Sequence, residues 1–171
     1  MIAYPTEAVF GLGCDPDNEQ AISRLLALKQ RPEHKGLIII AADVSQLLNY
    51  VREDLISIEM WQKTQDTWPG PVTWLMPAQT SVSKLITGDH ETIAVRVTAH
   101  TIARQLCEHF GKPIVSTSAN KAGFEPARSI AELNQQFDTG LSCIVDGEIN
   151  PKASPSEIRD LMTNNIIRKS E

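Results

Sequence analysis

The stretch LIIIAA at residues 37–42 is the most strongly apolar run in the chain. It holds three consecutive β-branched isoleucines and no polar residue, a composition typical of a strand that is covered on both faces of a sheet. The run is far too short to cross a membrane. It therefore predicts a buried strand, and the segments on either side of it decide what kind of sheet that strand joins.

Helical and extended patterns alternate outward from this strand. Apolar residues recur with helical spacing from about 18 to 30, where Asp15, Asp17 and Asn18 offer N-caps, and Gly111 is placed to end a helix over 101–110. These patterns predict an α/β fold, with a twisted mixed sheet flanked by helices in one domain. Further helices are expected near 44–51, 54–65 and 129–137, and strands over 2–4, 37–42, 72–76, 92–97, 114–117, 141–145, 156–161 and 165–168, with Gly11 and Gly13 on a loop after the first strand.

The composition is that of a globular protein. Of the 171 residues, 42% are apolar and 22% are charged, and the formal net charge is −5. An acidic total excludes a protein that coats nucleic acid by bulk charge, but a local basic cleft stays open. The three cysteines lie far apart without metal-ligand spacing, and the N-terminal residues show no secretory signal, so a cytoplasmic protein with reduced thiols is expected.

The strongest local feature is KQRPEHK at residues 29–35, where the first predicted helix gives way to the buried strand. Three cations within seven residues suit an anion site, because Arg offers a planar fork to phosphate oxygens and Lys a compact charge. The alternative is a solvated helix end whose cations offset the helix dipole. The pattern by itself leaves both interpretations open.

A second feature is STSAN at residues 116–120, which follows the strand expected over 114–117. Ligands of open α/β sheets bind beyond the carboxyl ends of strands, and the hydroxyls and amide there can hydrogen-bond phosphate or hold a metal-bound water. The alternative is a polar turn that caps its own backbone.

Isolated residues are less informative. Arg96 ends a predicted strand and could reach the same site or form a surface salt bridge, and the same holds for Arg128 and Arg168. The four histidines share no metal-ligand spacing, so no zinc site is expected. The sequence also lacks the P-loop, dinucleotide-binding and nucleophile-elbow motifs, so a nucleotide would bind by another device.

Five short motifs follow one another along the chain: YPTEAVFGLGC at 4–14, KxRP at 29–32, PGPVT at 69–73, AVR at 94–96 and STSAN at 116–120. Together they resemble the YrdC/TsaC family of threonylcarbamoyl-AMP synthases, in its short single-domain bacterial form. The resemblance extends over essentially the whole chain, and five motifs in the right order are far more specific than one.

The resemblance implies a nucleotidyltransferase that makes threonylcarbamoyl-AMP and pyrophosphate from L-threonine, bicarbonate and ATP. The product would feed a threonylcarbamoyl transferase that modifies the adenosine beside the anticodon of tRNA, and tRNA itself is a further expected partner. A concave basic cleft is implied, with Mg²⁺ on the pyrophosphate and no metal held directly by the protein. The resemblance further implies that residues 1–171 lack the helix that usually precedes the first strand.

The resemblance also assigns roles to individual residues. Catalytic residues that hold the ATP phosphates and the adenylate are implied at Lys29, Arg31, Ser118 and Asn120. Further contacts to the nucleotide are implied at Arg128 and Arg168. Contacts to threonine are implied at Thr6, His34, Arg96 and Ser156.

Other functions are compatible with the same residues. A non-catalytic module that binds tRNA or double-stranded RNA is the main alternative, followed by a different nucleotidyl- or carbamoyl-transfer enzyme on the same fold and by an inactive paralogue. Release of pyrophosphate that requires both threonine and bicarbonate would favour the synthase. Salt-sensitive RNA affinity without turnover would favour the RNA-binding module.

Overall fold

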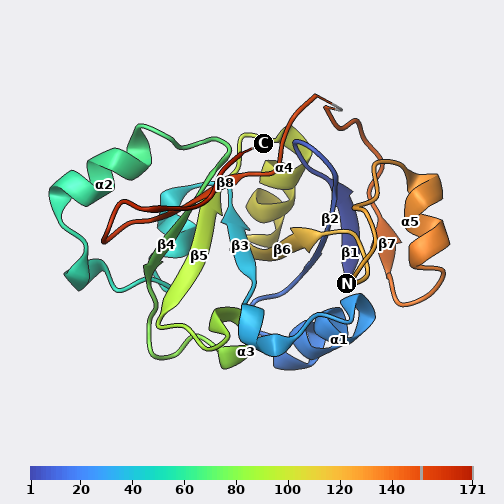
Figure 1. The fold of residues 1–171 in the computed structure, drawn as a ribbon, viewed down its shortest axis with the longest axis horizontal. Helices are drawn as coiled ribbons and strands as arrows, with labels where there is room; N and C mark the ends of the chain where they lie inside the picture. Colours follow the sequence, from blue (N-terminus) through green and yellow to red (C-terminus); the bar gives the residue numbers. More distant parts are fainter. Residues whose placement is uncertain (151, 171) are drawn as a thin grey trace.

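The computed structural model describes residues 1–150 and 152–170. Within them, the strands form one sheet in the order β7-β1-β2-β6-β3-β5-β4-β8-β9, with both parallel and antiparallel neighbours (Figure 1). The predicted α/β class with a mixed sheet is confirmed. The strands are β1 (Ile2–Pro5), β2 (Phe10–Cys14), β3 (Ile38–Ala41), β4 (Val72–Pro77), β5 (Thr92–Val97), β6 (Ile114–Ser118), β7 (Cys143–Ile144), β8 (Glu157–Asp160) and β9 (Ile166–Arg168).

The helices begin and end where their local sequence signals lie. The side chain of Asn18 accepts a hydrogen bond from the Ala21 amide at 3.0 Å and so caps the first helix. Gly111 ends the fourth helix in the left-handed conformation, with φ of 76°. The helices are α1 (Glu19–Lys29), α2 (Ile58–Gln65), α3 (Lys84–Thr87), α4 (Thr101–Phe110) and α5 (Ile130–Gln136), and 3₁₀ turns cover Glu33–Lys35, Val44–Leu47 and Glu53–Leu55.

Strand β3 lies inside the sheet, parallel to β5 and antiparallel to β6. Ile39, Ile40 and Ala41 are fully buried, as the unbroken apolar run predicts. Ile39 belongs to the larger apolar cluster, to which α1, α3 and α5 contribute side chains, whereas Ile40 belongs to a smaller cluster with Cys107 of α4. Successive side chains of one strand therefore fill the cores on the two faces of the sheet.

Gly11 and Gly13 lie in strand β2, so their prediction as loop residues is wrong. β2 pairs with β1 and β6, and a Cβ at Gly13 would lie only 2.8 Å from the Tyr4 ring and 2.8 Å from the Val115 carbonyl oxygen. Glycine is required here by close approach of neighbouring groups within the sheet, which a turn signal resembles in sequence.

The helices predicted near 44–51 and 54–65 are shorter in the structure. The first is only the 3₁₀ turn Val44–Leu47, because Val51 forms an extended bridge with Ala78. The first residues of the helix predicted near 54–65 form the 3₁₀ turn Glu53–Leu55 instead, and helix α2 starts only after its N-cap Ser57. The strand expected over 141–145 is reduced to the two residues of β7, and the short α3 has no counterpart among the predicted helices.

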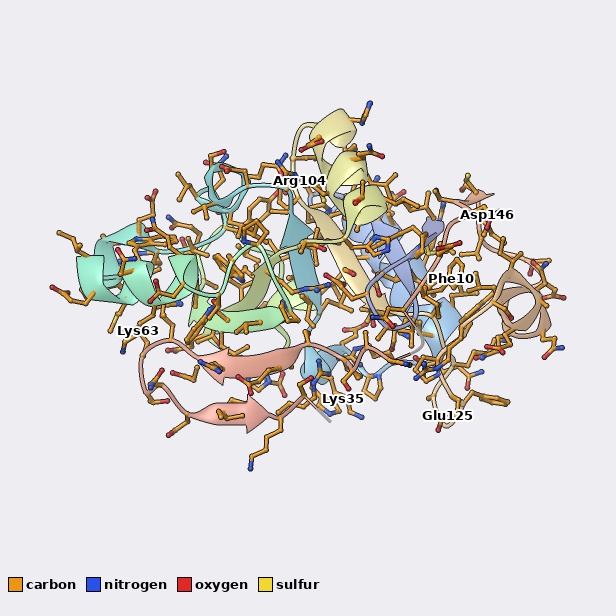
Figure 2. All side chains as sticks on the ribbon, turned by 90° about the horizontal axis from the view of Figure 1, so that it is seen from above. Phe10, Lys35, Lys63, Arg104, Glu125 and Asp146 are labelled. Carbon is orange, nitrogen blue, oxygen red and sulfur yellow. The ribbon has the colours of Figure 1, made fainter. Side chains whose placement is uncertain are left out.

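Helix α4 and the β8–β9 hairpin lie on opposite sides of the molecule. Figure 2 shows α4, marked by Arg104, at one side and the hairpin at the other. Helix α4 packs on the sheet face that carries Ile40, where Cys107 belongs to the same apolar cluster. The start of β8 lies level with the end of β5, because Glu157 pairs with Val72 and Trp74 with Val95.

Replacing Ile39 by Ala tests the central role of β3. Removing a fully buried isoleucine side chain should lower the free energy of unfolding by about 2–5 kcal/mol, because transfer and cavity costs add. The matched control is Ile58→Ala, since Ile58 is 85% exposed and its loss should change stability by less than about 0.5 kcal/mol. Urea unfolding measures both variants, and equal losses would contradict the placement of β3.

Candidate active site

A cavity of about 320 Å³ opens on the sheet face that carries Ile38 and Ile40. Its walls come from the loop after β1, the start of β2 and of β3, the ends of β5 and β6, and the segment before β8 together with β9. The cavity brings together six of the ten residues that the sequence predicts for the site. These are Thr6, Arg31, Arg96, Ser118, Ser156 and Arg168.

Strand register explains why residues so distant in sequence meet here. Ser118 at the end of β6 is paired with Gly11 at the start of β2, and Arg96 of β5 is paired with Ile40 of β3. Alternate residues of a strand share a face, so Ser116 and Ser118 line the cavity on the face that also carries Ile40. Hydroxyl groups therefore project where the strands end.

Lys29 lies next to the cavity and holds its wall together. This side chain at the end of α1 is 4% exposed, and its ammonium donates to the carbonyl oxygens of Ser118 and Asn120, the latter at 2.8 Å. The Ser118 hydroxyl donates to Asn120 Oδ1 at 2.6 Å. Burial and, next, the Arg31 charge lower the pKa of Lys29 to about 8. The predicted KxR and SxN residues thus form one connected group.

Arg31 and Arg168 are anchored in the same way. Arg31 donates through Nε at 3.1 Å and Nη2 at 2.9 Å to the Gly36 carbonyl, and Arg168 through Nε at 3.2 Å and Nη2 at 2.6 Å to the Ser156 carbonyl. No hydrogen bond of the described residues uses Nη1 of either arginine. Each guanidinium is therefore held by one edge with donors left for a ligand.

The cations of the cavity perturb one another. Burial and then the Arg168 charge lower the pKa of Arg31, and burial and then the Arg96 charge lower the pKa of Arg168. Like charges gathered in a partly dry site raise the energy of the empty protein, and a bound anion relieves that repulsion. That a concave basic cleft extends beyond this cavity stays a prediction.

The small hydroxyl residues are also fixed by hydrogen bonds. Thr6 Oγ1 donates to the Val9 carbonyl at 2.6 Å, and Ser156 Oγ lies 2.9 Å from Thr73 Oγ1. Arg168 Nη2 reaches Ser156 Oγ as well, at 3.2 Å. These contacts leave the hydroxyls little rotational freedom, a condition for precise ligand placement.

Arg96 forms a buried ion pair and not the surface salt bridge that its sequence position allowed. Its Nη1 donates to Glu7 Oε1 at 2.7 Å, and its side chain is 9% exposed. Glu7 also lines the cavity, and no role was predicted for it. The available signal was an acidic residue directly after Thr6 in an otherwise apolar segment, but its partner is 89 residues away.

His34 and Arg128 are not brought to this cavity. His34 lies exposed on the turn Glu33–Lys35 and borders a separate open cavity of about 310 Å³ near Asp89. Arg128 precedes α5, where its backbone amide donates to Glu132 Oε2 at 2.6 Å. Both residues follow site motifs closely in sequence, but the turns after those motifs direct the chain away.

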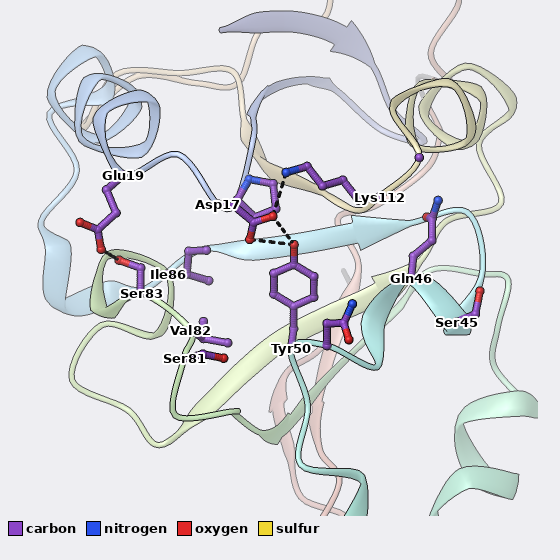
Figure 3. A pocket seen from close by; sticks show the side chains of 13 residues that line it. Asp17, Glu19, Ser45, Gln46, Tyr50, Ser81, Val82, Ser83, Ile86 and Lys112 are labelled. Atoms are coloured by element: carbon purple, nitrogen blue, oxygen red, sulfur yellow. Dashed lines mark hydrogen bonds and ion pairs between the residues drawn. The ribbon is translucent and has the colours of Figure 1, made fainter.

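A larger cavity of about 680 Å³ contains none of the predicted residues (Figure 3). There the Tyr50 hydroxyl donates to Asp17 Oδ1 at 2.9 Å, Lys112 donates to Asp17 Oδ2 at 2.8 Å, and Ser83 donates to Glu19 at 2.6 Å. Its charged side chains already have hydrogen-bonding or ionic partners within the cavity, so the smaller cavity is the stronger candidate on chemical grounds.

Residues 1–150 and 152–170 contain no group of three or more His, Cys, Asp or Glu side chains placed to hold a metal ion. In the same part of the chain, every helix is too short or too polar to cross a bilayer.

Comparisons with curated proteins give close relatives along the whole chain. The threonylcarbamoyl-AMP synthases of Serratia proteamaculans and Aliivibrio fischeri are each 52% identical to it, over 169 and 170 residues. These alignments cover 99% of this chain in both cases, and 89% and 91% of the relatives.

Solved structures share the fold. Sua5 of P. abyssi, solved in complex with L-threonine, superposes with a TM-score of 0.86 at 36% identity over 94% of this chain, which spans about half (47%) of that Sua5 chain. E. coli YciO gives a TM-score of 0.84 at 25% identity, covering 99% of this chain and 82% of its own. The model of the Sua5/YciO/YrdC family, described as telomere recombination, matches residues 1–170. The resemblance found in the sequence is confirmed, and the chain belongs to the Sua5/YciO/YrdC family.

Proposed function

We propose that the chain synthesises threonylcarbamoyl-AMP from L-threonine, bicarbonate and ATP, with release of pyrophosphate. The observation that carries the proposal is the 52% identity to threonylcarbamoyl-AMP synthases over 99% of the chain. The cavity supports it independently, because three arginines and several fixed hydroxyls converge on one space. Such a lining suits a substrate set of phosphates and carboxylates.

The nucleotide end of the cavity is formed by Arg31, Arg168 and the Ser118–Asn120 turn. The two arginines would bind phosphate oxygens through the N–H groups that are not bonded to the Gly36 and Ser156 carbonyls. Ser118 would hydrogen-bond the α-phosphate. Lys29 adds a buried charge and orders the turn through its two carbonyl contacts. Mg²⁺ enters the proposal with ATP, as the counter-ion of its phosphates. Arg128 and His34 lie outside the lining of this cavity, and their contacts to the nucleotide and to threonine stay predictions.

The amino-acid end is formed by Thr6, Arg96 and Ser156. Arg96 would bind the carboxylate of threonine, and the fixed hydroxyls of Thr6 and Ser156 would recognise its small polar groups. The P. abyssi Sua5 structure, a complex with L-threonine at 36% identity, supports an amino-acid subsite on this fold.

The chemistry needs no protein nucleophile. The amine of threonine and bicarbonate give a carbamate and water, and a carbamate oxygen then attacks the α-phosphorus while pyrophosphate leaves. The reaction is thus a nucleotidyl transfer, whose catalysis consists mainly of positioning and stabilisation of phosphate charge. Lys29, Arg31 and Arg168 supply both, because their hydrogen bonds to backbone carbonyls fix the orientation of their side chains before the substrate binds.

The product is a reactive mixed anhydride and requires an acceptor. We infer a threonylcarbamoyl transferase that acts on tRNA as the consumer, and the cytoplasm as the setting in which ATP, bicarbonate and tRNA meet.

The direct test is an assay of the purified chain with MgATP, labelled bicarbonate and L-threonine. Label should enter threonylcarbamoyl-AMP, and pyrophosphate release should require threonine and bicarbonate together. Omission of either substrate provides the control. Pyrophosphate release that persists without threonine would point to a different transfer enzyme, and salt-sensitive RNA binding without any turnover would point to an RNA-binding module.

Replacing Arg31 by Ala tests the nucleotide end. Losing one charged donor that stabilises the transition state typically costs about 2.7–4 kcal/mol, so kcat/KM should fall about a hundredfold or more. The control is Arg24→Ala, which removes the same charge from an exposed position on α1 and should leave the rate unchanged. Circular dichroism verifies folding, and a folded, fully active Arg31→Ala protein would refute the assigned role.

The pH dependence of nucleotide binding tests Lys29. Because the pKa of Lys29 is lowered to about 8, its charge is present below pH 8 and is lost as the pH rises through that value. The Kd of a non-hydrolysable ATP analogue should therefore increase between pH 7.5 and 9, by up to about tenfold. Lys29→Arg stays charged over this range and should give a flatter profile in the same calorimetric titration. Parallel profiles would contradict a role for the Lys29 charge.

A further inference from the structure

The guanidinium of Arg96 is incompletely paired although it is buried. Arg96 is 7% exposed, lines the cavity, and its Nε is a buried side-chain nitrogen that finds no hydrogen-bond partner among the described residues. A buried donor without a partner costs free energy, and a structure tolerates it where a ligand supplies the acceptor. The unpaired Nε is therefore best explained by an acceptor that arrives with the substrate.

Glu7 holds this guanidinium from the opposite side. Glu7 Oε1 accepts hydrogen bonds from Arg96 Nη1 at 2.7 Å and from Thr98 Oγ1 at 3.0 Å, and the Glu7 carbonyl accepts from the Asn150 amide at 3.0 Å. The Glu7 carboxylate thus connects the loop after β1 to strand β5 and the residue that follows it, and the Glu7 backbone connects the same loop to the segment after β7. Thr98 is fully buried, so this arrangement has little room to relax.

The charge of Glu7 distinguishes Arg96 from the other arginines of the cavity. Burial acts to raise the pKa of Glu7, but the Arg96 charge and the hydrogen bonds of Arg96 and Thr98 outweigh it, so its pKa lies below the usual value and the pair stays ionic. Arg31 and Arg168 rest on carbonyl oxygens instead. Their charge stays uncompensated for phosphates, whereas the Arg96–Glu7 pair suits a ligand that is itself close to neutral.

We propose that Glu7 is a positioning residue that aims Arg96 at the amino-acid substrate and sets that end of the cavity apart from the ATP end. The inference rests on the proposed function and adds a residue to it. Glu7 acts through Arg96, so its loss should weaken the binding of L-threonine and leave ATP binding intact.

The test compares Glu7→Ala, Glu7→Gln and the wild-type chain by steady-state kinetics and by calorimetric titration with L-threonine. Glu7→Ala should raise the KM and the Kd for threonine by about tenfold or more, the range for a lost hydrogen bond to a charged group. Glu7→Gln, which keeps the shape and an accepting oxygen, should recover part of this loss. The KM for ATP should stay within about twofold throughout, a split that general destabilisation would not produce.

The matched control is Glu108→Gln. Glu108 also pairs with an arginine, Arg104 at 2.9 Å, but on the exposed surface of α4, so both KM values should stay unchanged. If Glu7→Ala does not fold, Thr98→Val provides the test. It removes the Thr98 hydrogen bond to the same oxygen and the His100 amide bond to Thr98 Oγ1, and it keeps the ion pair. It should raise the KM for threonine about threefold.

The outcomes separate the two claims. A KM for threonine that stays within twofold in Glu7→Ala, or in Thr98→Val where that variant replaces it, would overturn the role of Glu7. The same follows if both KM values rise in step. A wild-type chain that binds L-threonine but forms no threonylcarbamoyl-AMP would overturn the proposed function, and the titrations would then still decide on Glu7. A wild-type chain that does not bind L-threonine would overturn both.

Discussion

The pairing of β6 between β2 and β3 is the constraint on which the rest of the molecule depends. It joins the strands β7-β1-β2 to the strands β3-β5-β4-β8-β9, so in the described part of the chain β6 links the two groups of strands. Its register also sets the faces. Since side chains alternate, a slip of one residue would turn Ser116 and Ser118 into the apolar cluster and bring Val115 to the cavity. The fold and the site therefore share one determinant.

The buried charges of the cavity lower the stability of the folded protein. Burying cations without carboxylate partners is unfavourable, and the lowered pKa values of Lys29 and Arg31 express that cost. A protein selected for stability alone would place apolar residues or ion pairs there. Among the arginines of the cavity, the described residues give a carboxylate partner to Arg96 alone. The charges are thus compensated selectively, as the proposed binding of two substrates of different charge requires.

Prediction from sequence succeeded where a local signal was sufficient. Helix α4 has the bounds that its apolar period and Gly111 predict, and the run at 37–42 is the buried strand β3. It failed where a distant neighbour decides. Gly13 is a strand residue because the Tyr4 ring and the Val115 carbonyl approach it, and Val51 is extended because Ala78 pairs with it. The site followed the same division: six predicted residues meet at the cavity, but the place of Glu7 depends on Arg96, far along the chain.

Under the proposed function, the anchoring of the arginines would let an acidic protein bind an anionic substrate. The net charge of −5 describes the whole surface, but binding depends on the few donors that face the ligand. Arg31 and Arg168 each place Nε and Nη2 on a backbone carbonyl, which fixes the plane of the guanidinium without neutralising it. A carboxylate anchor would fix the same plane but cancel the charge. Backbone carbonyls thus provide orientation while the full positive charge stays available, and the ordering of these long side chains is complete before the substrate binds.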